Sequence, residues 1–174
     1  MYYRTRTYIA ADWDHDKDAV DALHAWNNSS KYGLSFSDAH DLTQSKDTSM
    51  NCTIKRSLAD RLNASKTFIL IVGDHTNEVR AGACYYCDNY GYFGYCTKGY
   101  NTDNRSYIEY ECNKAVKDGL NIIVLYKSTY VDLEKCPECV RYVGVHKPMV
   151  KIQNGRYVWD YASVLEAVYS TNKN

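Results

Sequence analysis

Two short and almost uninterrupted apolar runs constrain the fold of this chain more than any other feature. They are residues 67–72 (TFILIV) and residues 120–126 (LNIIVLY). Runs of this length and composition are typical of strands that are covered on both faces, as in parallel sheets. The first run stops at Gly73, and the second follows a helical pattern over residues 106–118 that ends at Gly119. The sequence therefore predicts a parallel sheet with these two runs as central strands.

Strands and helices alternate along the rest of the chain. The expected strands are residues 5–11, 33–36, 67–72, 120–126 and 148–152, and the expected helices are residues 17–26, 54–62, 106–118 and 160–171. Such alternation indicates βαβ units with right-handed crossovers. Five strands in one small domain favour an α/β fold with a flavodoxin-like, doubly wound parallel sheet, whose ligands bind beyond the carboxyl ends of the strands.

Length and charge narrow the class of protein further. The 174 residues fit a single domain spanning residues 1–174, and the 21 basic and 21 acidic side chains cancel. The chain therefore has no excess of basic side chains that would attract nucleic acid or a membrane surface. No stretch approaches the roughly 18 consecutive apolar residues of a membrane span, and no apolar signal core follows the first residues. Because the seven cysteines are odd in number, we expect thiols or metal ligands in a cytoplasmic protein.

One segment stands apart in composition. Residues 81–107 contain seven of the 18 tyrosines, three of the seven cysteines and four of the nine glycines. The stretch is too long for an ordinary connection between a strand and a helix. We interpret residues 81–105 as an insert after the third expected strand, beside the predicted crevice. Tyrosines interleaved with glycine are typical of an adaptable recognition loop, and equally of rings that cover the edge of a core while their hydroxyls stay wet.

Acidic side chains follow the expected strands at their carboxyl ends. Asp12 and Asp14 follow the first strand, and Asp74 follows the third. Closely spaced carboxylates after a parallel strand are typical of a Mg²⁺ or phosphate site, although charge in a solvated loop before a helix explains them as well. The pattern loosely resembles haloacid-dehalogenase-type phosphatases and response-regulator receivers. A phosphoryl-transfer or receiver-type domain is therefore one alternative for the function.

The helix expected over residues 106–118 carries a more telling pattern. Tyr107 is followed four positions later by Glu111, and the helix leads into the apolar run at residues 120–126. This order is similar to the third helix of TIR domains, where a Trp-x-x-x-Glu arrangement carries the enzyme's glutamate. In this chain Tyr107 takes the aromatic place and Glu111 the glutamate place. Glu109 lies two positions away, so it points elsewhere on the helix.

Two further runs agree with this resemblance. Phe36-x-Asp38 ends the second expected strand, and residues 65–73 (SKTFILIVG) lead from the second helix into the third strand. Over about residues 5–127 the chain resembles the bacterial TIR-like domain family, and within it the Thoeris ThsB-type proteins of anti-phage defence. The resemblance implies cleavage of NAD⁺ at the nicotinamide–ribose bond. The product would be ADP-ribose or a cyclic ADP-ribose signal that acts on an effector protein.

The resemblance also implies which residues form the site. Glu111 would be catalytic, because a carboxylate near the ribose stabilises the positive charge of an oxocarbenium-like transition state. Tyr107 would shape the pocket. The residues expected on the nucleotide side are Ala10, Ala11, Asp12, Asp38 and Asp74. The alternative from another class is a non-catalytic TIR-like interaction module, which would form homo-oligomers through its helices and the Tyr-rich insert.

Two Cys-x-x-Cys pairs have the spacing that lets two thiolates bind one tetrahedral zinc ion. The first pair follows the third expected strand and the second follows the fourth, so both project from the same edge of the sheet. We therefore expect a structural Zn²⁺ held by Cys84, Cys87, Cys136 and Cys139, with unpaired thiols as the alternative. A redox role is disfavoured because neither pair opens a helix after the first strand. Cys112 is interpreted as a packing residue.

Overall fold

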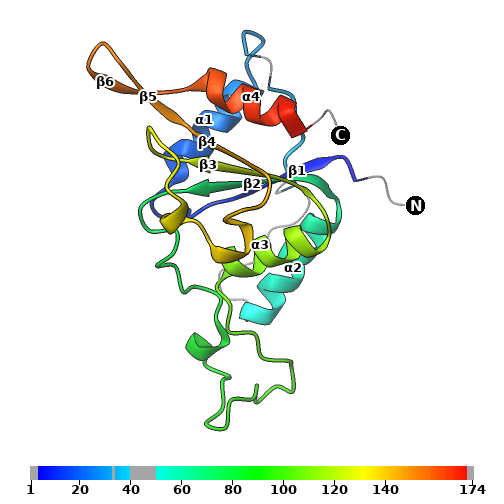
Figure 1. Ribbon diagram of the computed structural model, residues 1–174. Coiled ribbons are helices and arrows are strands. Elements are labelled where there is room, and N and C mark those ends of the chain that lie inside the picture. The colour runs from blue at the N-terminus through cyan, green and yellow to red at the C-terminus, as the bar shows by residue number, and fades with distance from the viewer. Residues whose placement is uncertain (1–3, 33, 40–49, 172–174) are drawn as a thin grey trace.

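A four-stranded parallel sheet forms the centre of the fold (Figure 1). The computed structural model describes residues 4–32, 34–39 and 50–171. Every neighbouring pair of strands in the sheet is parallel. The strands lie in the order β1 (Arg6–Ala10), β2 (Ser65–Val72), β3 (Asn121–Tyr126) and β4 (Val145–Pro148). The two apolar runs thus form the central strands β2 and β3, as their sequence predicts.

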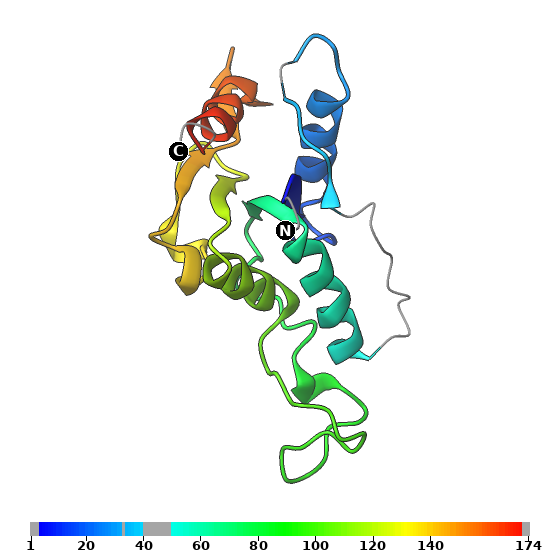
Figure 2. The same cartoon turned by 90° about the vertical axis from the view of Figure 1, so that its right-hand side faces the viewer.

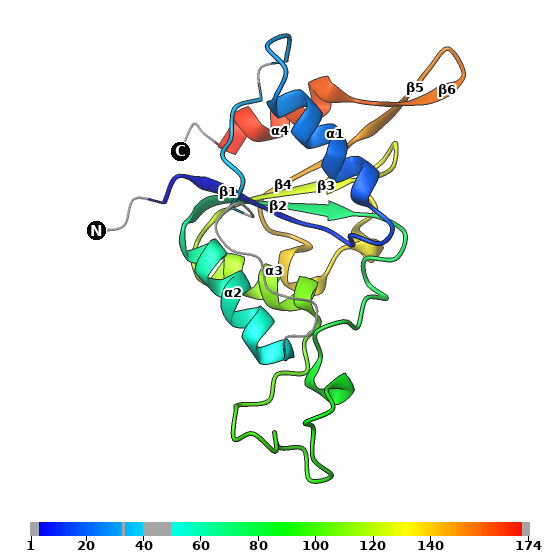
Figure 3. The same cartoon turned by 180° about the vertical axis from the view of Figure 1, so that it is seen from behind.

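Helices cover both faces of this sheet, with α1 and α4 on one face and α2 and α3 on the other (Figures 1 and 3). Their bounds are α1 (Lys17–Asn27), α2 (Asn51–Asn63), α3 (Tyr107–Lys117) and α4 (Tyr161–Thr171). Phe68 and Leu70 of β2 face α2 and α3, whereas Ile69 and Ile71 face α1 and α4. Because both faces of β2 are buried, the prediction of an α/β fold with a parallel sheet is confirmed. None of the described helices is long and apolar enough to cross a membrane.

The strand expected at residues 33–36 is absent over residues 34–36, and residue 33 lies outside the described part of the chain. Asp38 makes a single parallel bridge with Thr7 of β1. Further back, the Asn27 side chain bonds the N–H of Phe36 at 2.8 Å and its carbonyl oxygen at 3.0 Å. These backbone groups are therefore taken and cannot extend a ladder with β1. Within the described residues the parallel sheet has four strands instead of the predicted five.

The strand expected at residues 148–152 is divided between two sheets. Pro148 ends β4, opposite Tyr126 of β3. The chain then turns away as β5 (Val150–Gln153), which forms an antiparallel hairpin with β6 (Arg156–Trp159) in a separate two-stranded sheet (Figure 1). The turn between them is Asn154-Gly155, and both residues have positive φ, at 52° and 72°. An Asn-Gly turn of this kind is typical of two-residue hairpins.

Residues 81–105 form a long connection between β2 and α3 that extends away from the sheet, beyond the ends of α2 and α3 (Figures 1 and 2). The connection contains one short 3-10 helix (Cys84–Tyr86) and a single antiparallel bridge between Tyr90 and Cys96. Two of its rings are almost fully exposed, Tyr92 at 98% and Phe93 at 83%. This segment therefore presents aromatic side chains to solvent instead of adding them to the core.

Two glycines test how tightly β4 packs against β3. Gly144 and Gly155 both have positive φ, at 82° and 72°. A Cβ at Gly144 would lie 2.2 Å from the carbonyl oxygen of Ile122, whereas a Cβ at Gly155 would meet nothing within 4 Å. We expect Gly155→Ala to lower the free energy of unfolding by about 1–2 kcal/mol through its backbone conformation. Gly144→Ala should lower it by about 1–3 kcal/mol more through the clash.

Urea titration of both variants measures this difference in the free energy of unfolding. Because the two substitutions share the same backbone cost, Gly155→Ala is the matched control. Equal losses of stability in the two variants would contradict the close approach of Gly144 to β3.

Candidate functional site

Charged side chains converge where β1, β2 and β3 end. Asp12, directly after β1, is only 7% exposed, and its Oδ1 accepts the N–H of Asp14 at 3.1 Å. Its Oδ2 lies 2.7 Å from Nδ1 of His15, whose ring centroid is 4.4 Å from that of His75 after β2. Lys127, directly after β3, donates to the carbonyl oxygen of His15 at 2.8 Å. Together with Asp16, these residues form an edge cluster (Asp12, His15, Asp16, His75 and Lys127) at the position where this fold class binds ligands.

Asp16 is the most deeply buried acid of the edge cluster. Its side chain is 2% exposed, its Oδ1 lies 3.5 Å from Nζ of Lys127, and its Oδ2 has no hydrogen-bond partner within the described part of the chain. Burial raises the pKa of Asp16, and Lys127 opposes that shift. Gly73 makes room for the carboxyl group, because a Cβ there would lie 2.1 Å from Oδ1 of Asp16. Asp16 is not among the site residues expected from the sequence, although a glycine directly after a buried strand is a signal for such a close approach.

Four of the residues expected on the nucleotide side lie at this edge of the sheet. Asp74 among them extends into solvent, where its hydrogen bond with Lys135 (2.5 Å) lowers the pKa of its carboxyl group. Across the described residues, no group of three or more His, Cys, Asp or Glu side chains is arranged to hold a metal ion. The Mg²⁺ site of the phosphoryl-transfer alternative stays a prediction. The four residues are Ala10, Ala11, Asp12 and Asp74.

Glu111 lies in a second place, between α3 and the face of the sheet. Its side chain is 7% exposed, and its Oε1 accepts a hydrogen bond from the hydroxyl of Tyr8, a fully buried residue of β1. Burial raises the pKa of Tyr8 well above its usual value, and Glu111 adds to this shift. Arg61 of α2 and Asp38 are close enough to act on the same group. Tyr8 and Glu111, with Arg61 and Asp38 near enough to act on the Tyr8 hydroxyl, form an inner cluster apart from the edge cluster.

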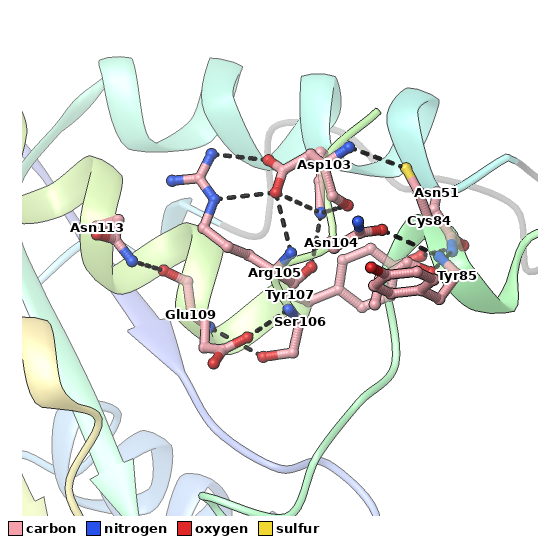
Figure 4. Close-up of polar contacts among 12 residues, drawn as sticks. Asn51, Cys84, Tyr85, Asp103, Asn104, Arg105, Ser106, Tyr107, Glu109 and Asn113 are labelled. Atoms are coloured by element: carbon pink, nitrogen blue, oxygen red, sulfur yellow. Dashed lines mark hydrogen bonds and ion pairs between the residues drawn. The ribbon is translucent and has the colours of Figure 1, made fainter. Parts of the chain in front are cut away.

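Tyr107 anchors the start of α3. Its hydroxyl donates to Oδ1 of Asn51 in α2 at 3.0 Å, and its N–H donates to the carbonyl oxygen of Ala81 at 2.8 Å. Figure 4 shows this end of the helix with the loop that leads into it. Burial raises the pKa of Tyr107 to about 12, so its hydroxyl stays a donor. Tyr107 therefore sits one turn before Glu111, in contact with α2 and the preceding loop.

A capping box begins α3 (Figure 4). The Oγ of Ser106 accepts the N–H of Glu109 at 3.2 Å, and Oε2 of Glu109 accepts the N–H of Ser106 at 2.7 Å. These reciprocal bonds satisfy two of the free N–H groups at the helix start. Glu109, the other carboxylate near the expected catalytic position, therefore stabilises the amino-terminal end of α3.

A buried lysine fastens the loop before α3 to α2. Lys55 is 4% exposed and donates to the carbonyl oxygens of Asp103 and Arg105 at 2.9 and 2.7 Å. Burial lowers the pKa of Lys55, and Asp103 opposes the shift. Burial would raise the pKa of Asp103, but hydrogen bonds from Arg105 at 2.9 and 2.7 Å outweigh it and lower that pKa to about 2. We call Lys55, Asp103 and Arg105 the polar lock.

The two Cys-x-x-Cys pairs occupy different parts of the structure. Cys84 and Cys87 lie in the 81–105 segment, where Sγ of Cys84 accepts the N–H of Asp103 at 3.1 Å. Cys136 and Cys139 instead pack against the core formed by α2, α3 and the sheet. All seven cysteines are described and are free thiols, and none belongs to a group arranged to hold a metal ion. The structure thus does not bring the two pairs into one group, and the four-thiolate zinc site stays a prediction.

Comparison with known proteins finds a family match in the amino-terminal part of the chain. Residues 8–81 match the family model described as the TIR-like domain of the Thoeris protein ThsB. The matched range includes Tyr8, Asp12 and Asp38 and ends before α3, which carries Glu111. No curated protein matches the chain.

The polar lock gives a direct test of how the 81–105 segment is held. Lys55→Met removes the donor to two carbonyl oxygens, and we expect it to lower the free energy of unfolding by about 2–4 kcal/mol. Proteolysis within residues 81–105 should become faster, because the segment loses its connection to α2. Arg56→Met on the exposed side of the same helix is the matched control, with an expected change within about 0.5 kcal/mol. Guanidinium titration and limited proteolysis measure both effects, and similar behaviour of the two variants would refute the lock.

Proposed function

We propose that this chain, whose residues 8–81 match the TIR-like domain of the Thoeris protein ThsB, signals in bacterial anti-phage defence by cleaving NAD⁺ between nicotinamide and ribose. The observation that best supports this reaction is the position of Glu111, a buried carboxylate that accepts a hydrogen bond from Tyr8. The products would be nicotinamide and ADP-ribose, or a cyclic form of ADP-ribose that acts on a separate effector protein.

Cleavage of the nicotinamide–ribose bond requires a group that stabilises positive charge. The ribose carbon becomes oxocarbenium-like in the transition state. A fixed carboxylate in surroundings of low dielectric stabilises this charge more strongly than a carboxylate in water. Glu111 meets the requirement because it is 7% exposed and its Oε1 is oriented by the Tyr8 hydroxyl. The raised pKa of Tyr8 keeps this hydroxyl protonated, so it remains a donor throughout the physiological pH range.

The nucleotide part of NAD⁺ would bind along β1, from Asp38 beside Thr7 to Asp12 beyond the end of the strand. Ala10 and Ala11 are buried there, so they would form the floor of the site beneath the substrate. The carboxylates of Asp12 and Asp38 are suited to accept hydrogen bonds from ribose hydroxyls. Asp12 is already held by His15 at 2.7 Å and Asp38 by His24 at 3.1 Å, so neither carboxylate has to be ordered when the substrate binds.

Glu111→Gln tests the proposed catalytic carboxylate. The substitution keeps the size of the side chain and removes its charge, so we expect NAD⁺ turnover to fall at least about 100-fold. Glu109→Gln is the matched control on the same helix, because glutamine also completes a capping box, and its turnover should stay within about twofold. Chromatographic measurement of nicotinamide release compares the variants at equal helix content. Wild-type turnover in Glu111→Gln would remove this residue from the mechanism.

Tyr8→Phe tests the hydrogen bond that orients Glu111. Loss of the hydroxyl leaves the Glu111 carboxylate with one donor fewer in a buried site, and we expect turnover to fall about tenfold while the substrate KM changes little. Tyr157→Phe on the exposed hairpin is the control, since that ring is 76% exposed. Unchanged turnover in Tyr8→Phe would show that the hydrogen bond serves the fold alone.

The exposed aromatic side chains of the 81–105 segment favour a second candidate function, a TIR-like module that assembles without catalysis. Tyr92 and Phe93 are 98% and 83% exposed, and their rings lie 5.3 Å apart. Exposed aromatic pairs of this kind are frequent at protein interfaces. Self-association that is lost in the double variant Tyr92→Ser/Phe93→Ser, together with absent NAD⁺ turnover, would favour the module over the enzyme. Sedimentation velocity measures self-association, and nicotinamide release measures NAD⁺ turnover.

A further inference from the structure

Two cysteines from distant parts of the chain meet beside α3. Cys112 lies in the middle of α3 with no exposed surface, and its thiol donates a hydrogen bond to the sulfur of Cys139. Cys139 is half-buried in the short 3-10 helix Glu138–Val140, which we call the 138–140 helix. Both residues pack into the same apolar cluster. Their contact therefore depends on the fold and not on a local Cys-x-x-Cys motif.

Cys139 is also open to small solutes. It lines a cavity of about 440 Å³ between α3, the 138–140 helix and the loop after β2. Arg80, Arg105 and Arg141 line the same cavity. A space of this size admits a molecule as small as hydrogen peroxide, and nearby guanidinium groups favour a thiolate. Cys112 does not line this cavity and has no exposed surface.

The two thiols differ in how readily they ionise. The hydrogen bond from Cys112 lowers the pKa of Cys139, and the N–H of Cys139 itself and Arg105 act in the same direction. Burial raises the pKa of Cys112 well above its usual value, and its hydrogen bond to Cys139 adds to the shift. The thiolate is the reactive form of cysteine. Cys139 is therefore the nucleophile of the pair, and Cys112 retains its proton.

Cys136 is a poorer partner for Cys139, although the two share a Cys-x-x-Cys motif. Cys136 is fully buried, which raises its pKa, and its sulfur accepts a hydrogen bond from the hydroxyl of Tyr126. That hydroxyl also lies 2.8 Å from Nδ1 of His146. Cys136 is thus tied to β3 and β4, whereas Cys139 already contacts Cys112.

We propose that Cys139 and Cys112 form a reversible oxidation site for hydrogen peroxide and small organic hydroperoxides. The Cys139 thiolate attacks the O–O bond and becomes a sulfenic acid, and the other oxygen leaves as water or an alcohol after taking up a proton. The Cys112 sulfur then attacks the sulfenic sulfur, which forms the disulfide and releases water. The two thiols lose two electrons, and the hydroperoxide gains them. An external dithiol restores both thiols.

Oxidation of the reduced, full-length protein with one equivalent of hydrogen peroxide tests this site. Digestion without reductant, followed by mass spectrometry, identifies the first disulfide to form. We expect the peptides that contain Cys112 and Cys139 to be linked first. A first disulfide between any other cysteines, Cys136–Cys139 included, would overturn the proposal. This measurement uses the unsubstituted chain, so it does not depend on a variant that folds.

Substitutions distinguish the nucleophile, Cys139, from Cys112, which forms the disulfide with it. Cys139→Ser should slow peroxide consumption at least about tenfold, and Cys112→Ala should leave Cys139 as a sulfenic acid that dimedone traps. Cys87→Ser is the matched control, because Cys87 is also half-buried but lies in the 81–105 segment. We expect this control to consume peroxide at the wild-type rate. Consumption that falls more in Cys87→Ser than in Cys139→Ser would contradict the assignment of the nucleophile.

Discussion

The burial of β2 and β3 on both faces is the constraint on which the rest of the structure depends. Strands with no polar side require helices above and below the sheet, since no part of their surface can face water at low cost. This requirement places α3 against the face of the sheet that α2 also covers, where Glu111 accepts a hydrogen bond from Tyr8 of β1. It also gathers the ends of three parallel strands at one edge, where Asp12, Asp16 and Lys127 lie together. The edge cluster and the inner cluster therefore owe their positions to the sheet.

The sequence was sufficient for those parts of the fold that depend on local patterns. The apolar runs identify β2 and β3, and the helix over residues 106–118 agrees closely with α3 (Tyr107–Lys117). The strand expected at residues 33–36 fails because a side chain, Asn27, takes the hydrogen bonds of Phe36. No pattern within residues 33–36 contains that information. The hairpin of β5 and β6, in contrast, was predictable, because Asn154-Gly155 is an Asn-Gly turn signal between two short runs.

The candidate site was less predictable, because it depends on contacts between distant residues. α3 does contain a signal for Glu111: the buried residues Ile108, Glu111, Cys112 and Ala115 recur at i, i+3, i+4 and i+7, so a carboxylate occupies a core position of an amphipathic helix. The Cys-x-x-Cys spacing does not predict the contact of Cys139, because it pairs cysteines that are neighbours in the sequence. The partner that contacts Cys139 is Cys112, which the pattern assigns to packing alone.

Glu111 and Cys112 are consecutive residues of α3, and each is held by a different element. Tyr8 of the sheet holds Glu111, and Cys139 of the 138–140 helix holds Cys112. A disulfide requires the two sulfurs to approach to about 2.05 Å, well inside hydrogen-bond distance. In the proposed oxidation the sulfurs of Cys112 and Cys139 would approach each other by side-chain rotation or by a shift of the 138–140 helix towards α3. Glu111 precedes Cys112 on the same turn of α3, while Tyr8 belongs to the central sheet. The proposed thiol pair and the proposed catalytic carboxylate are therefore neighbours on one helix, and each depends on a different part of the structure for its contact.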